Sequence, residues 1–257
     1  MVESLTGGRR IGMLVLSCDA YAPLWEAHFR ELERHWPDCP FSKLLLTNRL
    51  DPGIRGVEAL QAGDDRGWSD NLLTALDTIQ ERFDWLLLTF DDLMLVQRVD
   101  NDRLGAALDS FFRVGGDCIQ LIRWHNRIRR VDEQIGSIAP GSLYRPTCVW
   151  ALWRVETLRQ LLVPGESAWQ FERNGSPRSD QFDGFYAVHE PIFLYHNTVI
   201  RGRIVPGDVK RFNLTPGDKL RPMTAMQWLR FKVRYLAFKS FLSLVPTTMQ
   251  RRFRNNQ

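Results

Sequence analysis

The sequence predicts an α/β protein: a mostly parallel sheet flanked by helices, with a basic amphipathic helix at the C-terminal end. Residues 10–17 and 85–90 are apolar runs without the alternation of a half-exposed strand, a pattern typical of strands buried on both faces of a parallel sheet. A stretch with mostly helical apolar spacing, 24–35, lies between the first run and a short apolar run at 43–47. A strand, a helix and a strand in this order indicate the opening of an α/β fold.

Later segments continue the alternation of strands and helices. We expect a third short strand at 57–60 and a helix opened by residues 67–70, with Ser69 or Asp70 as its N-cap and an apolar stripe along one side. Further helices are expected at 100–114 and 155–162, further strands at 118–123, 185–189 and 192–195, and a strand or a hairpin at 198–205. Residues 126–141 and 166–176 are rich in polar and turn-forming residues, so both are expected to be loops, the first a mobile cover over a site.

Length and composition are those of an ordinary globular protein. The 257 residues suit one large domain or one and a half ordinary ones, and 44% of them are apolar and 25% charged. The four cysteines are scattered without the spacing of metal ligands, which is typical of free thiols in a reducing compartment. The first ten residues lack the apolar region of a signal peptide, and no stretch reaches the roughly 18 uncharged apolar residues of a membrane-spanning helix. We therefore expect a cytoplasmic protein.

The net charge of +4 hides an uneven distribution of basic residues. Seven of the 34 basic residues and none of the 30 acidic residues lie from Thr224 onward, which leaves 27 basic against 30 acidic residues in the first 223. A body that binds nucleic acid is therefore not expected. We expect two parts, a globular domain over 1–223 and a basic helical tail over 224–257.

The tail contains a stretch, 226–245, that is helical in composition and has apolar residues at roughly helical spacing. Basic charge combined with Trp, Phe and Leu and with no acid is typical of a helix lying in an anionic membrane interface, so peripheral contact with the inner face of the cell membrane is one expectation. The alternative is a helix that packs on the domain and leaves its basic side in solvent. In neither case does it span a membrane.

Two adjacent carboxylates, Asp91 and Asp92, follow the apolar run at 85–90. Burying two ionised carboxylates costs several kcal/mol each unless a metal or another cation compensates them. We therefore expect the pair at the carboxyl end of the strand, because that edge is where open α/β sheets bind their ligands. The alternative is that the two residues only cap the turn after the strand.

Three motifs occur in order along the chain: Gly67-Trp68-Ser69 at a helix start, Asp91-Asp92-Leu-Met-Leu after a strand, and Trp169-Gln-Phe171-Glu172. This order resembles the GT-A glycosyltransferases, in which a glycine-opened helix runs into a strand that ends in an acidic D-x-D-type motif. The closer resemblance is to a bacterial GT-A-like group linked to the synthesis of surface polysaccharides such as lipopolysaccharide and capsule. It covers residues 10–205 and implies a GT-A-like, Rossmann-like sheet.

The resemblance implies an enzyme that moves a sugar from a nucleotide-sugar donor to a hydroxyl of a surface-glycan or lipid-linked acceptor. It assigns Asp91 and Asp92 to a divalent cation, Mn²⁺ or Mg²⁺, and to the donor's diphosphate, whose developing charge the cation neutralises. It assigns Ser17, Cys18 and Asp19, at the end of the first strand, to the nucleotide. The pair is D-D here rather than D-x-D, so the metal is left open and Arg or Lys side chains are alternative partners of the diphosphate.

Trp68 and Ser69 would lie beside the donor if the resemblance holds. The alternative for Trp68 is a hydrophobic staple at the helix start, and the alternative for Asp19 is an Asx turn that leads into the following helix.

A general base is needed to take the proton of the acceptor hydroxyl, and Glu172 is our candidate, with Asp92 in the same catalytic set. The aromatic neighbours of Glu172 can raise the pKa of its carboxyl group and offer a stacking surface for a sugar ring. Asp180 and Asp183 compete for this role. The alternative for Glu172 is an exposed turn residue paired with Arg173.

Two other functions remain open at this level. The first is a nucleotide-sugar- or glycan-binding protein that keeps a GT-A-like scaffold without catalysis, since a fold does not fix a function. The second is a metal-dependent phosphohydrolase, which would need further His or Asp ligands at short spacing, and the sequence shows none.

Overall fold

The computed structural model describes residues 7–122 and 128–244 of the chain. The chain divides into two compact units, Met1–Asn197 and Thr198–Gln257, and each is described by itself. The domain boundary between residues 223 and 224 stays a prediction.

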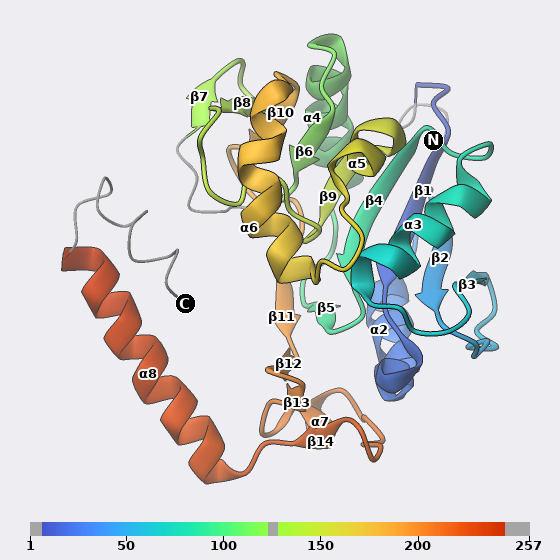
Figure 1. The fold of residues 1–257 in the computed structure, drawn as a ribbon, viewed down its shortest axis with the longest axis vertical. Coiled ribbons are helices and arrows are strands. Elements are labelled where there is room, and N and C mark those ends of the chain that lie inside the picture. Colours follow the sequence, from blue (N-terminus) through green and yellow to red (C-terminus); the bar gives the residue numbers. More distant parts are fainter. Residues whose placement is uncertain (1–6, 123–127, 245–257) are drawn as a thin grey trace. The chain divides into compact units, whose positions relative to one another are not determined.

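A nine-stranded sheet forms the centre of the first unit, with the strand order β3-β2-β1-β4-β9-β6-β10-β8-β7 (Figure 1). Its strands are β1 Ile11–Leu16, β2 Ser42–Thr47, β3 Val57–Gln61, β4 Trp85–Phe90, β6 Cys118–Gln120, β7 Ile128–Arg130, β8 Ile135–Ile138, β9 Ala151–Arg154 and β10 Phe185–Val188. Strands β9 and β8 run antiparallel to the strands beside them, and the other neighbours pair in parallel. The predicted α/β class, with a mostly parallel sheet flanked by helices, is confirmed.

Helices cover both faces of this sheet because its central strands are apolar on both sides. The helices are α2 Ala22–His35, α3 Trp68–Ile79, α4 Asn101–Arg113, α5 Val155–Leu161 and α6 Ala168–Arg178. Met13 and Val15 of β1 belong to the core with residues of α2 and α4, whereas Leu14 and Leu16 belong to the core with residues of α3, α5 and α6. This division of one strand between two cores is what its unbroken apolar sequence predicts.

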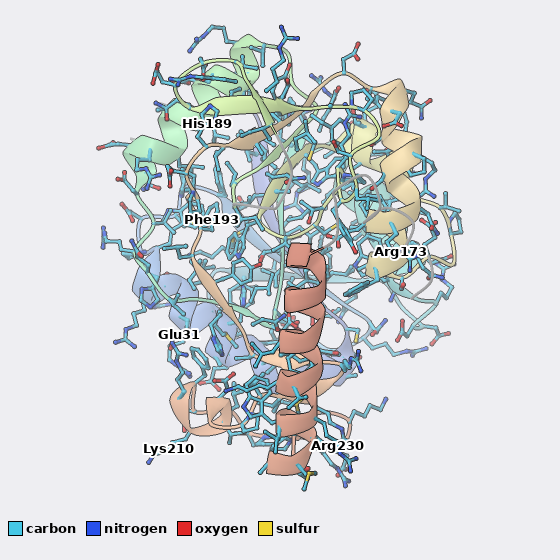
Figure 2. The ribbon with its side chains drawn as sticks, turned by 90° about the vertical axis from the view of Figure 1, so that its left-hand side faces the viewer. Glu31, Arg173, His189, Phe193, Lys210 and Arg230 are labelled. Carbon is cyan, nitrogen blue, oxygen red and sulfur yellow. The ribbon has the colours of Figure 1, made fainter. Side chains whose placement is uncertain are left out.

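The α2–α4 core also holds a stack of rings around Phe193, which is 1% exposed (Figure 2). Phe193 lies 4.3 Å from Trp150 between ring centroids, with the planes 15° apart, and 5.2 Å from Trp36. The stack joins the chain after β10 to the C-cap residue of α2 and to the segment before β9, so three segments far apart in the sequence share one core.

The order of the first four strands creates the place where a ligand can bind. The connection from β1 to β2 runs through α2 on one face, and the connection from β3 to β4 runs through α3 on the other face. Strands β1 and β4 are neighbours, so the direction of winding reverses between them. In open α/β sheets a crevice forms outside the carboxyl ends of the strands at such a point, here after Leu16 and Phe90.

Two segments that we expected to be loops are regular structure, so those predictions are wrong. Strand β7 and strand β8 lie within 126–141 and pair with each other, and β8 also pairs with β10; residues 126 and 127 lie outside the described part. Helix α6 covers most of 166–176 and begins with a capping box in which Ser167 and Gln170 satisfy each other's backbone amides. The predicted cap of α3 at Ser69 or Asp70 is also wrong, because Gly67 is its N-cap residue.

A short two-stranded sheet extends the fold beyond β4. Strand β5, Leu93–Leu95, follows the acidic pair directly and pairs antiparallel with β11, Tyr195–Asn197. We expected the second of these strands three residues earlier, at 192–195. The pairing brings a late segment of the unit beside the acidic pair.

The described part of the second unit, residues 198–244, contains a three-stranded sheet and two helices. Its elements are β12 Val199–Ile200, β13 Arg203–Ile204, β14 Arg221–Pro222, α7 Asp208–Arg211 and α8 Ala225–Leu244. The predicted hairpin at 198–205 and the predicted helix over the described part of 226–245 are present. Apolar residues occupy several sides of α8, so its polar and apolar faces are less separated than we expected. Within the described residues, no helix is long and apolar enough to cross a membrane.

The packing predicts different stability costs for two adjacent phenylalanines of α4. Phe111 is fully buried and contacts Trp85 and Tyr186 edge to face, at 5.5 and 6.1 Å between ring centroids. We expect Phe111→Ala to lower the free energy of unfolding by about 3–5 kcal/mol, measured by urea-induced loss of the circular dichroism signal. Phe112 is only half-buried, so Phe112→Ala is a matched control that should cost clearly less. Equal losses would contradict this placement of α4.

Candidate functional site

The candidate site is built around Asp91, the first residue after β4, which is 3% exposed. The Ser17 hydroxyl, directly after β1, donates a hydrogen bond to Asp91 Oδ2. Trp25 Nε1 of α2 donates in turn to Ser17 Oγ at 2.7 Å. The structure therefore brings together the ends of β1 and β4, as the placement of Ser17 and Asp91 at the carboxyl edge requires.

The two adjacent acids have raised pKa values. Burial, followed by the negative charge of Asp92, raises the pKa of Asp91 well above its usual range, and the hydrogen bonds from Ser17 and Trp25 offset this only in part. Burial raises the pKa of Asp92 to about 7. The groups that lower the pKa of Asp91 are hydroxyl, indole and backbone donors, not cations. A cation bound beside Asp91 would therefore relieve an electrostatic cost that these donors leave in place.

Two tyrosines and one cysteine lie within electrostatic reach of the pair. Burial, then the charges of Asp92 and Asp91, raise the pKa of Tyr21 to about 12. Burial also raises the pKa of the Cys18 thiol, so this thiol is not an activated nucleophile. Burial, then the charges of Glu172 and Asp92, raise the pKa of Tyr195. No sequence signal pointed to Tyr195, because its position depends on the pairing of β11 with β5.

Glu172 lies on α6, half-buried, and does not occupy an exposed turn, so that alternative is wrong. Its Oε1 accepts hydrogen bonds from Thr147 Oγ1 at 2.6 Å and from the Cys148 amide at 3.3 Å. Burial raises the pKa of Glu172, and these two bonds lower it less. The two competing acids, Asp180 and Asp183, are both exposed.

The segment that carries Thr147 is fixed by a buried arginine. The guanidinium of Arg145 is fully buried and faces the ring of Phe185 at 4.3 Å from its centroid. It donates to three backbone carbonyls, those of Ile138, Ser179 and Phe182. Tyr144 and Trp150, on either side, have left-handed φ angles of 54° and 46°, which non-glycine residues rarely adopt. The Thr147–Glu172 bond therefore rests on a segment with little freedom to move.

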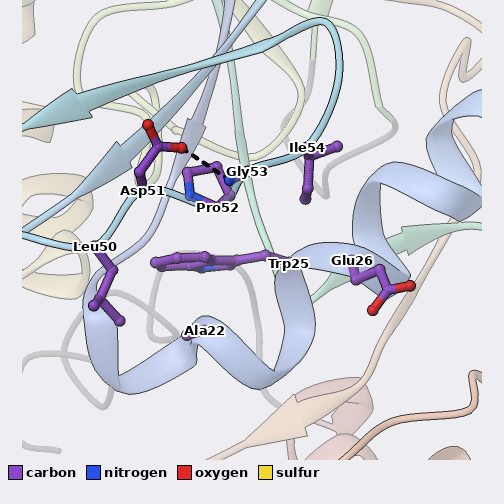
Figure 3. A pocket seen from close by; sticks show the side chains of 8 residues that line it. All are labelled: Ala22, Trp25, Glu26, Leu50, Asp51, Pro52, Gly53 and Ile54. Carbon is purple, nitrogen blue, oxygen red and sulfur yellow. Dashed lines mark hydrogen bonds between the residues drawn. The ribbon is translucent and has the colours of Figure 1, made fainter.

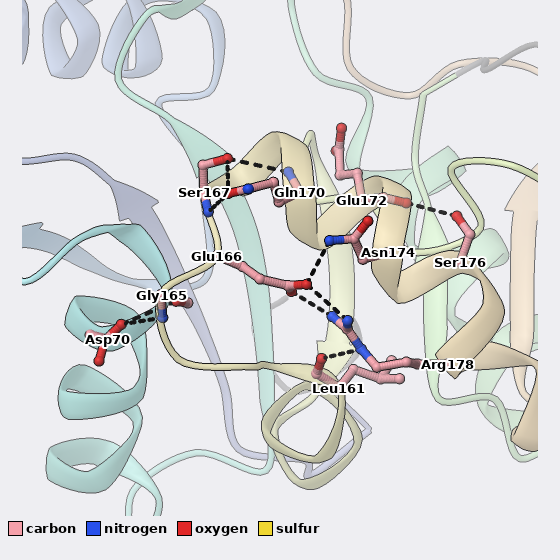
Figure 4. Close-up of polar contacts among 11 residues, drawn as sticks. Asp70, Leu161, Gly165, Glu166, Ser167, Gln170, Glu172, Asn174, Ser176 and Arg178 are labelled. Carbon is pink, nitrogen blue, oxygen red and sulfur yellow. Dashed lines mark hydrogen bonds and ion pairs between the residues drawn. The ribbon is translucent and has the colours of Figure 1, made fainter. Parts of the chain in front are cut away.

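The two aromatic motifs meet in space. Trp68, at the start of α3, contacts Phe171 of α6 at 5.4 Å between ring centroids, and Ser69 is fully buried. The Ser69 amide donates to the Glu166 carbonyl at 3.2 Å, and Asp70 Oδ2 accepts from the Gly165 amide at 2.7 Å (Figure 4).

Helix α6 is fixed by the acid just before its cap. Glu166 forms an ion pair with Arg178 at 2.6 Å and accepts a hydrogen bond from Asn174 Nδ2 at 2.9 Å, while the side chain of Glu172 points away from this network (Figure 4). The helix start that resembles the GT-A pattern is thus connected directly to the helix that carries Glu172. Contacts of this kind between distant segments cannot be inferred from motif spacing.

Asp19 has a positioning role that the sequence did not predict. Its carboxylate accepts hydrogen bonds from the amides of Asn48, Arg49 and Leu50 at 2.9, 3.0 and 3.3 Å. The Asp19 amide donates to Asn48 Oδ1 at 3.1 Å. The side chain therefore ties the end of β1 to the loop after β2, and less of its acceptor capacity is left for a nucleotide.

That loop forms one wall of a groove of about 580 Å³ beside α2. Figure 3 shows the flat ring of Trp25 below Pro52, with Leu50 and Ile54 on either side. The same indole that donates to Ser17 lines the groove, although Trp25 is only 4% exposed, so the groove and the acidic pair share a side chain. The lining combines apolar side chains with the carboxylates of Glu26 and Asp51, which suits a planar ring that carries hydrogen-bond donors.

The residues fit a divalent cation that arrives with a phosphate ligand. Among the described residues, no group of three or more His, Cys, Asp or Glu side chains could hold a metal ion. Asp91 and Asp92 alone would supply two carboxylates, and Mg²⁺ is commonly bound by one or two carboxylates together with water and substrate phosphates. A complete protein-only metal site is therefore not present in this part of the chain, whereas a site completed by a diphosphate agrees with the residues.

No protein-family model matches the chain, and no curated protein matches its sequence. Several solved structures are similar in fold. One is "mannose-1-phosphate geranyltransferase" from Thermus thermophilus, with 15% identity, 78% of this chain and 83% of that chain covered, and a TM-score of 0.43. Another is the mannosyltransferase PcManGT from Pyrobaculum calidifontis in complex with GDP-Man and Mn²⁺, with 15% identity, 75% and 58% covered, and a TM-score of 0.48.

A third similar structure is the UTP-bound UGPase from Acinetobacter baumannii, with 9% identity, 93% of this chain and 100% of that chain covered, and a TM-score of 0.47. These are likenesses of fold. At such identities and TM-scores they carry no argument about what this chain binds or does.

The raised pKa of Asp92 predicts a pH-dependent stability. Because the folded-state pKa of about 7 lies above the unfolded value, the neutral carboxyl group stabilises the fold fully below about pH 4, and this contribution is lost as the pH rises through about 7. In buffers without divalent cations, we expect the free energy of unfolding of the wild type, relative to that of Asp92→Asn, to fall between about pH 5 and pH 8. A difference that stays constant over this range would show that the pKa is not raised.

Proposed function

We propose that the chain is a glycosyltransferase that uses a nucleotide-sugar donor, with divalent-cation assistance. The observation that carries this proposal is the acidic pair, Asp91 and Asp92, with raised pKa values at the β1–β4 junction beside the groove next to α2. A pair of adjacent carboxylates, one of them buried, at a ligand-binding edge suits a metal–diphosphate group. A nucleotide sugar combines that group with a planar base, for which the groove next to α2 offers space.

The nucleotide part of the donor is assigned to the end of β1 and the loop after β2. Ser17 and Cys18 are assigned to the part of the nucleotide next to the acidic pair. Asp19 holds the loop that forms one wall of the groove. Trp68 is assigned to the donor side of the start of α3, and the fully buried Ser69 is assigned to positioning this helix start. When bound at Asp91 and Asp92, a divalent cation would neutralise the charge that develops on the departing diphosphate.

Glu172 is assigned as the general base. As the acceptor oxygen bonds to the anomeric carbon, the bond from that carbon to the diphosphate oxygen breaks, and the hydroxyl proton passes to the Glu172 carboxylate. Its raised pKa makes it a better base near neutral pH than an exposed carboxylate. The bond from Thr147 fixes the orientation of the carboxylate, and Tyr195 lies within electrostatic reach of both Glu172 and Asp92.

The acceptor is proposed to be a surface glycan or a lipid-linked saccharide at the inner face of the cell membrane. Helix α8 exposes four apolar side chains at helical spacing, those of Met226, Leu229, Val233 and Leu236, between 57% and 59% exposed. Arg230 and Lys232 lie exposed on the same helix, and no acidic residue follows Thr224. Exposed apolar and basic groups together suit contact with an anionic membrane surface.

A binding protein without catalysis is the second candidate. It is favoured by one observation, that the Glu172 carboxylate already accepts bonds from Thr147 and Cys148. Ligand binding without turnover, even with acceptor present, would support this candidate over the transferase.

The first test is stabilisation by nucleotide sugars, followed as a thermal shift with and without Mn²⁺. A ligand at about 100 times its dissociation constant should add about 2.7 kcal/mol to the free energy of unfolding. We expect one class of nucleotide sugar to stabilise the wild type only with Mn²⁺ and Asp92→Asn not at all. Asp109→Asn, an exposed acid on α4, is the matched control and should respond as the wild type does. No shift with any nucleotide sugar would overturn the proposed donor.

The second test separates binding from the proton transfer. We expect Glu172→Gln to keep the metal-dependent thermal shift while donor turnover falls by about 10²–10⁴-fold, because Gln keeps the size of the side chain and cannot take the proton. Glu156→Gln, at an exposed position of α5, should leave turnover unchanged. Full turnover in Glu172→Gln would remove Glu172 from the catalytic set.

A further inference from the structure

A basic cleft on the small sheet of the second unit has no part in the proposed transfer. It has a volume of about 410 Å³. Its lining combines four cationic side chains with one carboxylate and one glycine: Arg201, Arg203, Lys219, Arg221, Asp218 and Gly202. The cleft lies wholly within this unit, so its description does not depend on the first one.

The strand register brings two of these cations face to face. Arg203 of β13 is the register partner of Arg221 of β14. Side chains of paired residues project from the same side of a sheet, and like charges opposite one another destabilise the pairing. The next residue of β13, Ile204, is fully buried, so the small sheet has an apolar inner side and a cationic outer side.

Little negative charge in the cleft offsets this repulsion. Arg221 lies 3.5 Å from Asp218 Oδ1 and donates to the Asp218 carbonyl at 3.2 Å. In the described part of the chain, Arg201, Arg203 and Lys219 form no ion pair with a carboxylate. The cleft therefore keeps an excess of positive charge beside the paired strands β13 and β14.

The turn between β12 and β13 also places a cation where the backbone does not favour one. Arg201 and Gly202 are its two central residues, with left-handed φ angles of 52° and 70°. Two-residue hairpins with both angles positive favour Asn-Gly or Asp-Gly. An arginine here adds positive charge to the mouth of the cleft despite its poorer fit to the turn.

We propose that this cleft binds phosphate groups, with Arg203 and Arg221 holding one phosphate between them. Guanidinium groups match phosphate geometry with paired hydrogen bonds, and a phosphate between the two arginines replaces their repulsion by two attractions. Lys219 and Arg201 add charge at the rim. The proposal does not depend on the transferase function. The phosphate can belong to a lipid headgroup or to a soluble diphosphate.

The test uses the full chain and two probes. Inorganic pyrophosphate is titrated by calorimetry in the presence of EDTA, and flotation is measured with phosphatidylcholine vesicles with and without phosphatidylglycerol. The test variant is Arg203→Gln/Arg221→Gln. The control, Arg103→Gln/Lys210→Gln, removes the same charge from two exposed positions outside the cleft; Lys210 is labelled in Figure 2. Circular dichroism checks that each variant is folded.

We expect the test variant to lose at least about tenfold in affinity for one of the two probes while the control keeps the wild-type affinity. Loss for pyrophosphate alone indicates a soluble ligand, and loss for the anionic vesicles indicates a lipid headgroup. The variant Arg203→Lys/Arg221→Lys keeps the charge, and its affinity should lie between that of the wild type and that of the double Gln variant. If the double Gln variant does not fold, Arg203→Gln alone is judged by the same criterion. A folded test variant that matches the control on both probes overturns the proposal.

Discussion

The candidate site depends on the hydrogen bond that the Ser17 hydroxyl donates to the buried carboxylate of Asp91. A buried carboxylate costs several kcal/mol if it is ionised and has no partner, and here the available partners are a hydroxyl and, through it, the indole of Trp25. These donors join β1, β4 and α2 at one point, but they do not neutralise the charge. The remaining cost is what makes the β1–β4 junction a place for a cation and a phosphate rather than a closed piece of core.

The positions of the other candidate groups follow from contacts that connect distant segments. The carboxylate of Asp19 holds the loop after β2 through three backbone amides. Arg145 holds the segment that bonds Glu172, and Trp68 packs on Phe171 of the same helix as Glu172. Each of these contacts uses a side chain to fix backbone, so the groups that would meet a substrate are oriented by the fold before any substrate binds.

The elements that could be predicted from sequence are those whose own residues determine them. Strand β4 is apolar on both faces, and α2 and α4 carry helical apolar spacing, so both kinds of element were predicted near their observed positions. Helix α6 was missed because its apolar stripe is short and it contains Gly175 and Pro177, although its capping box at Ser167 and Gln170 was readable. Strands β7 and β8 were missed because polar residues dominate them and only pairing with each other and with β10 makes them strands.

In the candidate site, too, only the features that are determined by local sequence could be predicted. The acidic pair and the end of β1 could be placed together, because parallel strands end at one edge of the sheet. The roles of Trp25 and Arg145 and the position of Tyr195 could not, because each depends on a contact between segments far apart in the chain. The hydrogen bonds that Asp19 accepts could not be predicted either, since they come from the loop after β2.

The most direct test of the central claim is a crystal structure of the chain with Mn²⁺ and a nucleoside diphosphate, with data collected at the manganese absorption edge. The account predicts an anomalous peak within coordination distance of a carboxylate oxygen of Asp91 or Asp92, with the diphosphate bound to the same ion and the base in the groove next to α2. A nucleotide bound elsewhere, or an acidic pair without manganese at saturating metal, would contradict it.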